Sequence, residues 1–168
     1  MSEYELLSEA LSFSLAQWDV QDDCDAVVHL LDDYARDPMG GGAALSEYAR
    51  ENLARTMASM PGAFSVIGRM AGKPVALANC FTTLSTFACK PLVNIHDLSV
   101  VFDARGRGVG QRLLSYIEQE ARRRGCCKVT LEVLTGNEQA RRSYERFGFT
   151  LYTLDESTGH AILLQKIL

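Results

Sequence analysis

Residues 92–110, which read LVNIHDLSVVFDARGRGVG, join an expected strand to an expected helix through a loop of arginine and glycine. The first part, 92–101, is apolar and β-branched enough for a strand, and apolar residues recur at helical spacing over 111–124. The first N–H groups of a helix have no internal partner, and the helix dipole is positive there. Glycine lets the backbone approach an anion closely. The sequence therefore predicts a phosphate or pyrophosphate site at residues 105–110.

The spacing of this loop excludes the common nucleotide-binding patterns. No Gly-Lys-Ser/Thr follows, so the loop is not a Walker loop, and the spacing is not Gly-x-Gly-x-x-Gly. It is Arg105-x-x-Gly108-x-Gly110. A nucleotide-phosphate site of these common classes is therefore disfavoured.

The loop resembles the acyl-CoA-binding motif of the GNAT N-acyltransferase superfamily. Residues 98–100, Leu-Ser-Val, precede the motif and a helix follows it. A second block, ARRSYERFGF at 140–149, resembles a later helix and turn of that family. Two motifs in the right order make chance agreement unlikely, and the resemblance is firm from about Asn94 to Phe149.

The chain alternates between expected strands and helices without repeats or linkers, which favours a single α/β domain over residues 1–168. The expected strands are 11–18, 63–70, 74–88, 92–101, 128–134, 149–154 and 160–166. The expected helices are 22–34, 46–60, 111–124 and 137–147. In the second helix, Tyr48, Ala49, Leu53, Met57 and Met60 are expected to face inward. The resemblance implies a GNAT-like mixed sheet of about seven strands with flanking helices, whose central parallel strands, 92–101 and 127–134, splay apart.

The resemblance also implies acetyl-CoA as co-substrate and indicates which residues bind it. Backbone groups of residues 98–100 would pair with the pantetheine arm as an added strand would. The amides of the glycine-rich loop would take the pyrophosphate, and Asn137 would contact the arm while also capping its helix. The implied cofactor-binding residues are Leu98, Ser99, Val100, Arg105, Gly106, Arg107, Gly108, Val109, Gly110 and Asn137.

The chemistry implied is transfer of an acyl group from a thioester to a neutral amine, with an acid for the departing thiolate. Tyr144 matches the family tyrosine with that role, and a phenol with a pKa of about 10 is protonated at neutral pH. His96 or Asp97 could act as the base, directly or through water. Because side chains alternate along a strand, these two are expected on opposite faces, with only one facing the reaction. A structural role remains the competing interpretation for each.

Acceptor recognition is expected on the N-terminal helices, the variable part of the resembling family. An acidic and aromatic run, Asp32-Asp33-Tyr34, is followed by a loop with three consecutive glycines at 40–42. Asp33 and Tyr34 could therefore lie near the amine, in a lid or pocket. A solvated helix face that ends in a glycine turn is the alternative.

Composition indicates a compact protein without a membrane span or a nucleic-acid partner. Net charge is −4, which argues against nucleic acid and mildly favours a neutral or cationic substrate. No apolar run reaches the ~18 residues of a membrane helix. The acidic start, MSEYE, and an odd number of cysteines fit a cytoplasmic location. The five cysteines form no spaced metal-binding pair, so no metal is expected, and Cys126 and Cys127 are interpreted as small core residues.

The sequence thus predicts a cytoplasmic N-acetyltransferase that moves the acetyl group of acetyl-CoA to a small-molecule or peptide amine in a ternary complex. A homodimer is plausible for the resembling family. One alternative is an acyltransferase that uses another acyl-CoA or a non-amine acceptor. The other is an acyl-CoA-binding regulatory module without catalysis.

Overall fold

A computed structural model describes residues 11–153, 155, 157 and 159–167 of the chain. The chain forms two compact units, residues 1–131 and residues 132–168. The single-domain expectation therefore stays a prediction. The strands are β1 (Leu11–Leu15), β2 (Ala63–Met70), β3 (Lys73–Ser85), β4 (Lys90–Val100) and β5 (Val129–Leu131). The helices are α2 (Gln21–Arg36), α3 (Glu47–Ser59), α4 (Val109–Arg123) and α5 (Glu138–Phe147), with a 3₁₀ turn η1 at Phe102–Ala104.

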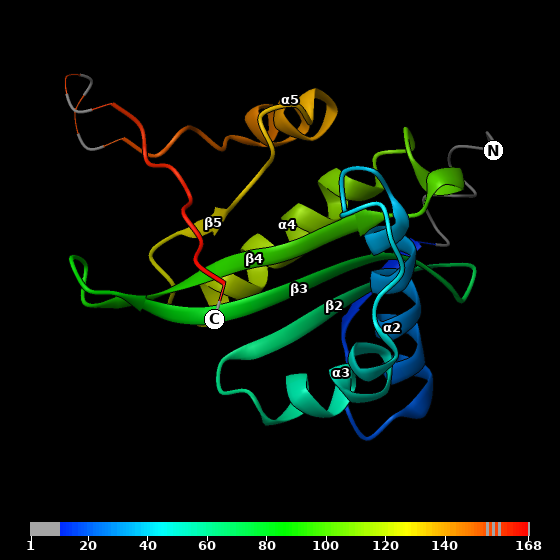
Figure 1. Ribbon diagram of the computed structural model, residues 1–168. Coiled ribbons are helices and arrows are strands. Elements are labelled where there is room, and N and C mark those ends of the chain that lie inside the picture. Colours follow the sequence, from blue (N-terminus) through cyan, green and yellow to red (C-terminus); the bar gives the residue numbers. More distant parts are fainter. Residues whose placement is uncertain (1–10, 154, 156, 158, 168) are drawn as a thin grey trace, which may run out of the picture. The chain divides into compact units, whose positions relative to one another are not determined.

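The first unit is built on one mixed sheet with the strand order β1-β2-β3-β4-β5 (Figure 1). The first four strands are antiparallel neighbours, and β5 pairs parallel to β4. The α/β class with a mixed sheet is confirmed. The described residues form five strands, so the expectation of about seven strands is wrong.

One face of the sheet is covered by α2 and α3, and α4 covers the other (Figure 1). Under α2, Val27 and Leu30 pack on Ile67 of β2 and Leu77 of β3, with Leu53 of α3 beside them. Each fully buried aliphatic side chain of this kind contributes about 1.5–3 kcal/mol to folding.

The α3 helix buries less than its sequence predicts. Met57 is buried, but Tyr48 is 77% and Met60 48% exposed, so the expectation that these two face inward is wrong. Ser46 caps the helix by accepting the Ala49 N–H, which fixes its first turn one residue later than expected.

On the opposite face, α4 presents a continuous apolar stripe to the sheet. The helix buries five apolar side chains, namely Val109, Leu113, Leu114, Ile117 and Ala121, together with the charged Glu120. Their spacing places them on one side of the helix. A Cβ on Gly110 would lie 3.9 Å from Cγ2 of Val100, so the first turn of α4 sits directly on the end of β4.

The pairing of β4 changes in the middle of the strand. Its parallel ladder with β5 runs from Val93 to Ile95 and then ends, whereas β4 continues to Val100. At the same place the register with β3 shifts, because Cys80 pairs with Ile95 and Asn79 with Asp97. The register leaves His96 as the additional residue of a β-bulge, which disrupts the ladder and bends the strand.

The second unit contains α5. Asn137 caps this helix by accepting the Ala140 N–H at 3.2 Å, and Gly148 ends it with a φ of +110°, as the sequence predicts. The expected closing hairpin over 149–154 and 160–166 is not found, since the described residues of that segment form no strand. Among the described residues, a backbone hydrogen bond from Ala161 N to Tyr152 O joins its two sides. Leu154 lies outside the described residues.

Among the residues that the structure describes, no helix combines the length and apolar character needed to cross a membrane.

Candidate active site

Beyond the bulge, β4 has one edge that no described strand covers. Val101 N donates to Val75 O of β3 at 2.9 Å. Because consecutive residues of an antiparallel strand direct their backbone groups to alternate edges, Val100 and Leu98 direct theirs away from β3. Ser99, opposite Leu77, directs its own toward β3. The exposed backbone groups can pair with an extended ligand in the manner of an added strand.

The glycine-rich loop continues from this edge to the start of α4. Gly106 and Gly108 have φ values of +76° and +75°, a region that side-chain-bearing residues rarely adopt. A Cβ at either position would have no atom within 4 Å, so it is the backbone conformation that requires glycine. Gly108 is the N-cap residue of α4 and supplies no side-chain cap. The positive end of the helix is therefore left for an external anion.

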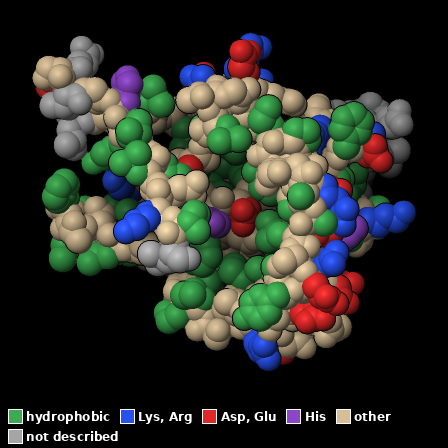
Figure 2. Space-filling model, viewed as in Figure 1, with side chains coloured by type: hydrophobic (Ala, Val, Ile, Leu, Met, Phe, Trp, Pro, Cys, Tyr) green, Lys and Arg blue, Asp and Glu red, His purple; other side chains and the backbone are tan. Residues whose placement is uncertain are grey.

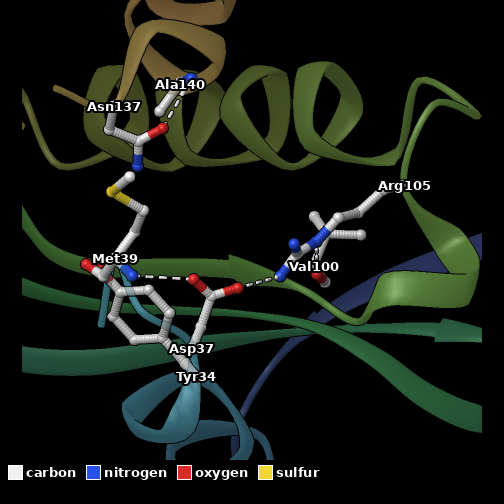
Figure 3. Close-up of polar contacts among 7 residues, drawn as sticks. All are labelled: Tyr34, Asp37, Met39, Val100, Arg105, Asn137 and Ala140. Carbon is white, nitrogen blue, oxygen red and sulfur yellow. Dashed lines mark hydrogen bonds and ion pairs between the residues drawn. The ribbon is translucent and has the colours of Figure 1, made fainter. Parts of the chain in front are cut away.

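The side chain of Arg105 holds the beginning of this loop (Figure 3). Its Nε donates to Val100 O at 2.9 Å, and its Nη2 donates to Asp37 Oδ2 at 2.9 Å. The other oxygen of Asp37 accepts the Met39 N–H at 2.9 Å. The Met39 N–H and then the Arg105 guanidinium hold the pKa of Asp37 below its ordinary value. Arg107 is exposed, as Arg105 is.

His96 and Asp97 lie on the same face of the sheet, which corrects the expectation that they point to opposite faces. The His96 ring meets Phe81 edge-on at 5.6 Å, and Asp97 Oδ2 accepts from Asn79 Nδ2 at 3.0 Å. Phe81 and Asn79 are two residues apart on β3 and so share one face. The reason is the β-bulge at His96, which suspends the alternation of side chains at this point.

Asp97 ends a chain of hydrogen bonds that crosses the sheet beneath α2. Ser65 Oγ donates to Asn79 Oδ1 at 2.6 Å, and Asn79 Nδ2 donates to Asp97. Ser65 and Asn79 are 1% and 2% exposed. Because the Ser65 hydroxyl donates to the amide oxygen, the amide presents its N–H to Asp97, whose Oδ2 accepts it.

Tyr34 comes to this group of residues from the last turn of α2, whereas Asp33 is exposed on the same helix. Burial raises the pKa of the Tyr34 phenol, and the charges of Asp97 and Asp37 raise it further. Its hydroxyl lies 3.5 Å from Met39 O. Figure 2 shows acidic side chains gathered over α2 and α3. An arrangement of carboxylates around a neutral phenol suits a cationic ligand.

The remaining two predicted residues belong to the second unit. Asn137 and Tyr144 lie two turns apart along α5 and hence on one side of the helix. Tyr144 is half-buried and meets the Phe149 ring edge-on at 5.9 Å.

The cysteines differ from the sequence-based interpretation. Cys126 is half-buried and Cys127 exposed, so the pair does not form part of the core. Cys80 is buried, and burial raises the pKa of its thiol to about 12, which keeps it protonated and unreactive. Across the described part of the chain, no group of three or more His, Cys, Asp or Glu side chains could hold a metal ion.

Sequence reasoning missed three contributors to the site: Ser65, Asn79 and Asp37. The first two could have been noticed as polar residues inside apolar strands, where burial requires a partner. The pairing of Asp37 with Arg105 spans 68 positions of sequence and left no local pattern.

The family model of the acetyltransferase (GNAT) family matches residues 15–149. The chain belongs to this family, so the assignment to it, and with it the class of enzyme, is confirmed. The match includes β4, the glycine-rich loop and α5.

Curated relatives share shorter segments with the chain. The N-acetyltransferase YhfO of Bacillus subtilis is 33% identical over 88 residues, which cover 52% of this chain and 56% of YhfO. Streptothricin acetyltransferase of Streptomyces lavendulae is 34% identical over 77 residues, 46% of this chain and 41% of that protein. The chain thus spans about half the length of these relatives.

Solved structures share the whole fold at low identity. An aminoglycoside acetyltransferase, meta-AAC0020, from an uncultured soil metagenomic sample superposes with a TM-score of 0.77 at 15% identity, covering 96% of this chain and 99% of that one. A transcriptional regulator from Bacillus halodurans gives 0.75 at 20% identity, covering 94% and 99%. These likenesses establish a GNAT-like α/β fold.

Proposed function

We propose that this protein is an N-acetyltransferase that moves the acetyl group of acetyl-CoA to an amine by direct attack in a ternary complex. The observation that carries the proposal is the open edge of β4 leading into the uncapped start of α4. The backbone groups of Leu98 and the N–H of Val100, whose carbonyl already accepts from Arg105 Nε, would pair with the amides of the pantetheine arm. The N–H groups of the loop and of the first turn of α4 would bind the pyrophosphate.

The acceptor amine would bind on the α2 face of β4. Asp97, held as a hydrogen-bond acceptor by Asn79, would bind the ammonium form of the substrate. His96, on the same face through the bulge, would take the proton before attack, directly or through water. Tyr34 would help to position the amine, and Asp33 remains a proposed contact at the rim.

Tyr144 would protonate the departing thiolate, since its phenol carries a proton at neutral pH. This assignment is supported by the family match over α5 and by the position of Tyr144 in the motif. Asn137 would contact the pantetheine arm from the start of the same helix.

The acceptor proposed is a cationic amine. Streptothricin acetyltransferase and the aminoglycoside acetyltransferase among the similar proteins act, by their names, on amine-bearing antibiotics. The carboxylates on the α2 side of this chain fit a substrate of that charge.

Thermal unfolding with acetyl-CoA, and with ATP as control, tests the first step. A ligand at 100 times its Kd stabilises the native state by about 2.7 kcal/mol, which corresponds to a Tm rise of roughly 5–10 °C for a chain of this size. We expect the rise with acetyl-CoA alone. An equal rise with ATP, or none with millimolar acetyl-CoA, would contradict the proposal.

Release of free CoA thiol over a panel of polyamines, aminoglycosides and peptides then tests turnover. Tyr144→Phe should lower kcat by about 10²–10⁴-fold while leaving acetyl-CoA affinity unchanged. A regulatory module without catalysis would release no thiol with any amine, although it would still bind acetyl-CoA.

A further inference from the structure

An ion pair between Asp37 and Arg105 joins two loops of the first unit. Asp37 begins the glycine-rich segment 37–45 after α2, and Arg105 begins the loop that leads to α4. Arg105 Nη2 donates to Asp37 Oδ2 at 2.9 Å, and the two side chains are 38% and 23% exposed. The pair therefore joins the segment expected near the acceptor to the segment expected to bind phosphate.

The contacts of the Arg105 guanidinium anchor the beginning of the glycine-rich loop. Its Nε donates to Val100 O at 2.9 Å, on the open edge of β4, and its carbon lies 5.9 Å from the centre of the Phe102 ring. With Asp37, the side chain thus has three contacts around the first residue of the loop. A planar guanidinium that donates in two fixed directions holds the backbone of its own residue in place better than a lysine ammonium could.

The loop needs such an anchor because its own backbone is permissive. Gly106 and Gly108 both have positive φ, and nothing lies within 4 Å of where their Cβ atoms would be. The glycines carry no side chain that could restrain the backbone of the loop. Fixing Arg105 fixes the point from which the N–H groups of the loop are directed toward a ligand.

Asp37 is itself held rigidly. Its Oδ1 accepts the Met39 N–H at 2.9 Å, and its backbone carbonyl accepts the N–H groups of Gly40 and Gly42 at 2.8 and 3.1 Å. A Cβ on Gly40 would lie 1.9 Å from Tyr34 O, so this turn is close-packed against the end of α2. The carboxylate that meets Arg105 is therefore part of a preformed turn (Figure 3).

We propose that Asp37 is a positioning residue for the acetyl-CoA site: through Arg105 it preorganises the phosphate loop, although it does not touch the cofactor. The inference rests on the proposed function. In consequence Asp37, which lies outside the Arg105–Gly110 motif, sets the affinity for acetyl-CoA, since preorganisation lowers the free-energy cost of ordering the loop on binding.

Calorimetric titration of the full chain with acetyl-CoA tests this without any acceptor. Asp37→Asn keeps the size of the side chain and the acceptor for Met39 N–H but removes the charge. We expect acetyl-CoA Kd to rise about three- to fivefold. Arg105→Gln should raise the Kd by about tenfold, because the hydrogen bonds of Nε to Val100 O and of Nη2 to Asp37 are lost. In the Arg105→Gln background, Asp37→Asn should add less than about 1.5-fold, since Asp37 acts through Arg105.

Asp32→Asn is the matched control. Asp32 Oδ1 accepts the Leu45 N–H at 2.8 Å and so holds the other end of the same segment, without contact to Arg105. This variant removes one charge and the ion pair of Asp32 with Arg36, yet it should leave acetyl-CoA Kd unchanged. Thermal unfolding of each variant establishes that it is folded at the temperature of the titration.

Five outcomes separate the possibilities. A higher Kd for Asp37→Asn that disappears in the Arg105→Gln background supports the inference. An unchanged or lower Kd for Asp37→Asn overturns it, as do additive effects in the double variant or an equal loss in Asp32→Asn. If the unaltered protein does not bind acetyl-CoA, the proposed function itself is wrong.

Discussion

At the scale of single residues, the buried hydrogen-bond chain from Ser65 through Asn79 to Asp97 stands out because polar groups in a sheet interior are costly without partners. An apolar pair would serve packing equally well at these positions. The chain of hydrogen bonds fixes the direction in which Asn79 donates, and so holds Asp97 as a hydrogen-bond acceptor. Burying the polar groups of Ser65 and Asn79 costs stability, which is consistent with a role of this hydrogen-bond chain at the candidate active site.

Replacing Asn79 by leucine should therefore destabilise the protein by about 1–3 kcal/mol, because Ser65 and Asp97 each lose a partner beneath α2. Urea denaturation measures the change. Asn52→Leu is the control: Asn52 Nδ2 donates to Tyr48 O on the outer side of α3, and its loss should cost no more than about 0.5 kcal/mol. Equal costs for the two variants would contradict this account.

Gly40 has a steric requirement that the sequence alone does not show. A Cβ there would lie 1.9 Å from Tyr34 O, a backbone atom that cannot move aside cheaply. Gly40→Ala should destabilise the protein by more than about 1 kcal/mol, as observed where alanine does not fit the native backbone. Gly136→Ala, with open space around it and no positive φ, should be tolerated. Chemical denaturation of both variants makes the comparison.

At the scale of elements, the junction between β4 and α4 depends on backbone conformation more than on side chains. Gly108→Ala forces a Cβ into the left-handed region at a cost of about 1–2 kcal/mol, so the loop should relax and acetyl-CoA should bind more weakly. Gly110→Ala meets only Val100 at 3.9 Å and should have a smaller effect. Titration with acetyl-CoA distinguishes the two. A larger loss for Gly110→Ala would mean that close approach, rather than backbone conformation, governs this loop.

At the scale of the whole molecule, several carboxylates make stability depend on pH. Arg123 and Arg124 hold the pKa of Glu120 below its ordinary value of 4.5, and Met39 N–H with Arg105 lowers that of Asp37 from 3.8. Because these pKa values are lower in the folded state, the ionised groups stabilise the fold above the unfolded values. That stabilisation is lost as the pH falls through the folded values.

Glu120→Gln should accordingly reduce the fall in Tm as the pH is lowered from 6 to 3. Glu120 is 7% exposed and its carboxylate meets both arginines, whereas Glu118 is more exposed and pairs with Arg122. Glu118→Gln should leave the pH profile nearly unchanged, since exposed helix pairs contribute little. Thermal melts across this range test the difference, and parallel profiles for Glu120→Gln and the unaltered protein would contradict it.

Most of the elements could be predicted from the sequence because their signals are local. The apolar spacing of α4, the caps at Ser46 and Asn137 and the run of β2 act within a few residues of where they appear. The closing hairpin failed for the same reason, since alternating apolar residues cannot by themselves provide a neighbouring strand.

By itself, the sequence determined the class of protein and the place of the glycine-rich loop, because a strand, an Arg-x-x-Gly-x-Gly loop and a helix are contiguous. Only the tertiary structure decided which side chains share the site. The bulge that brings His96 and Asp97 to one face arises from the register between β3 and β4. The contact of Asp37 with Arg105 arises from the packing of α2 against the sheet. Such relations depend on residues far apart in the chain, where strand pairing and helix packing, rather than local preference, set the geometry.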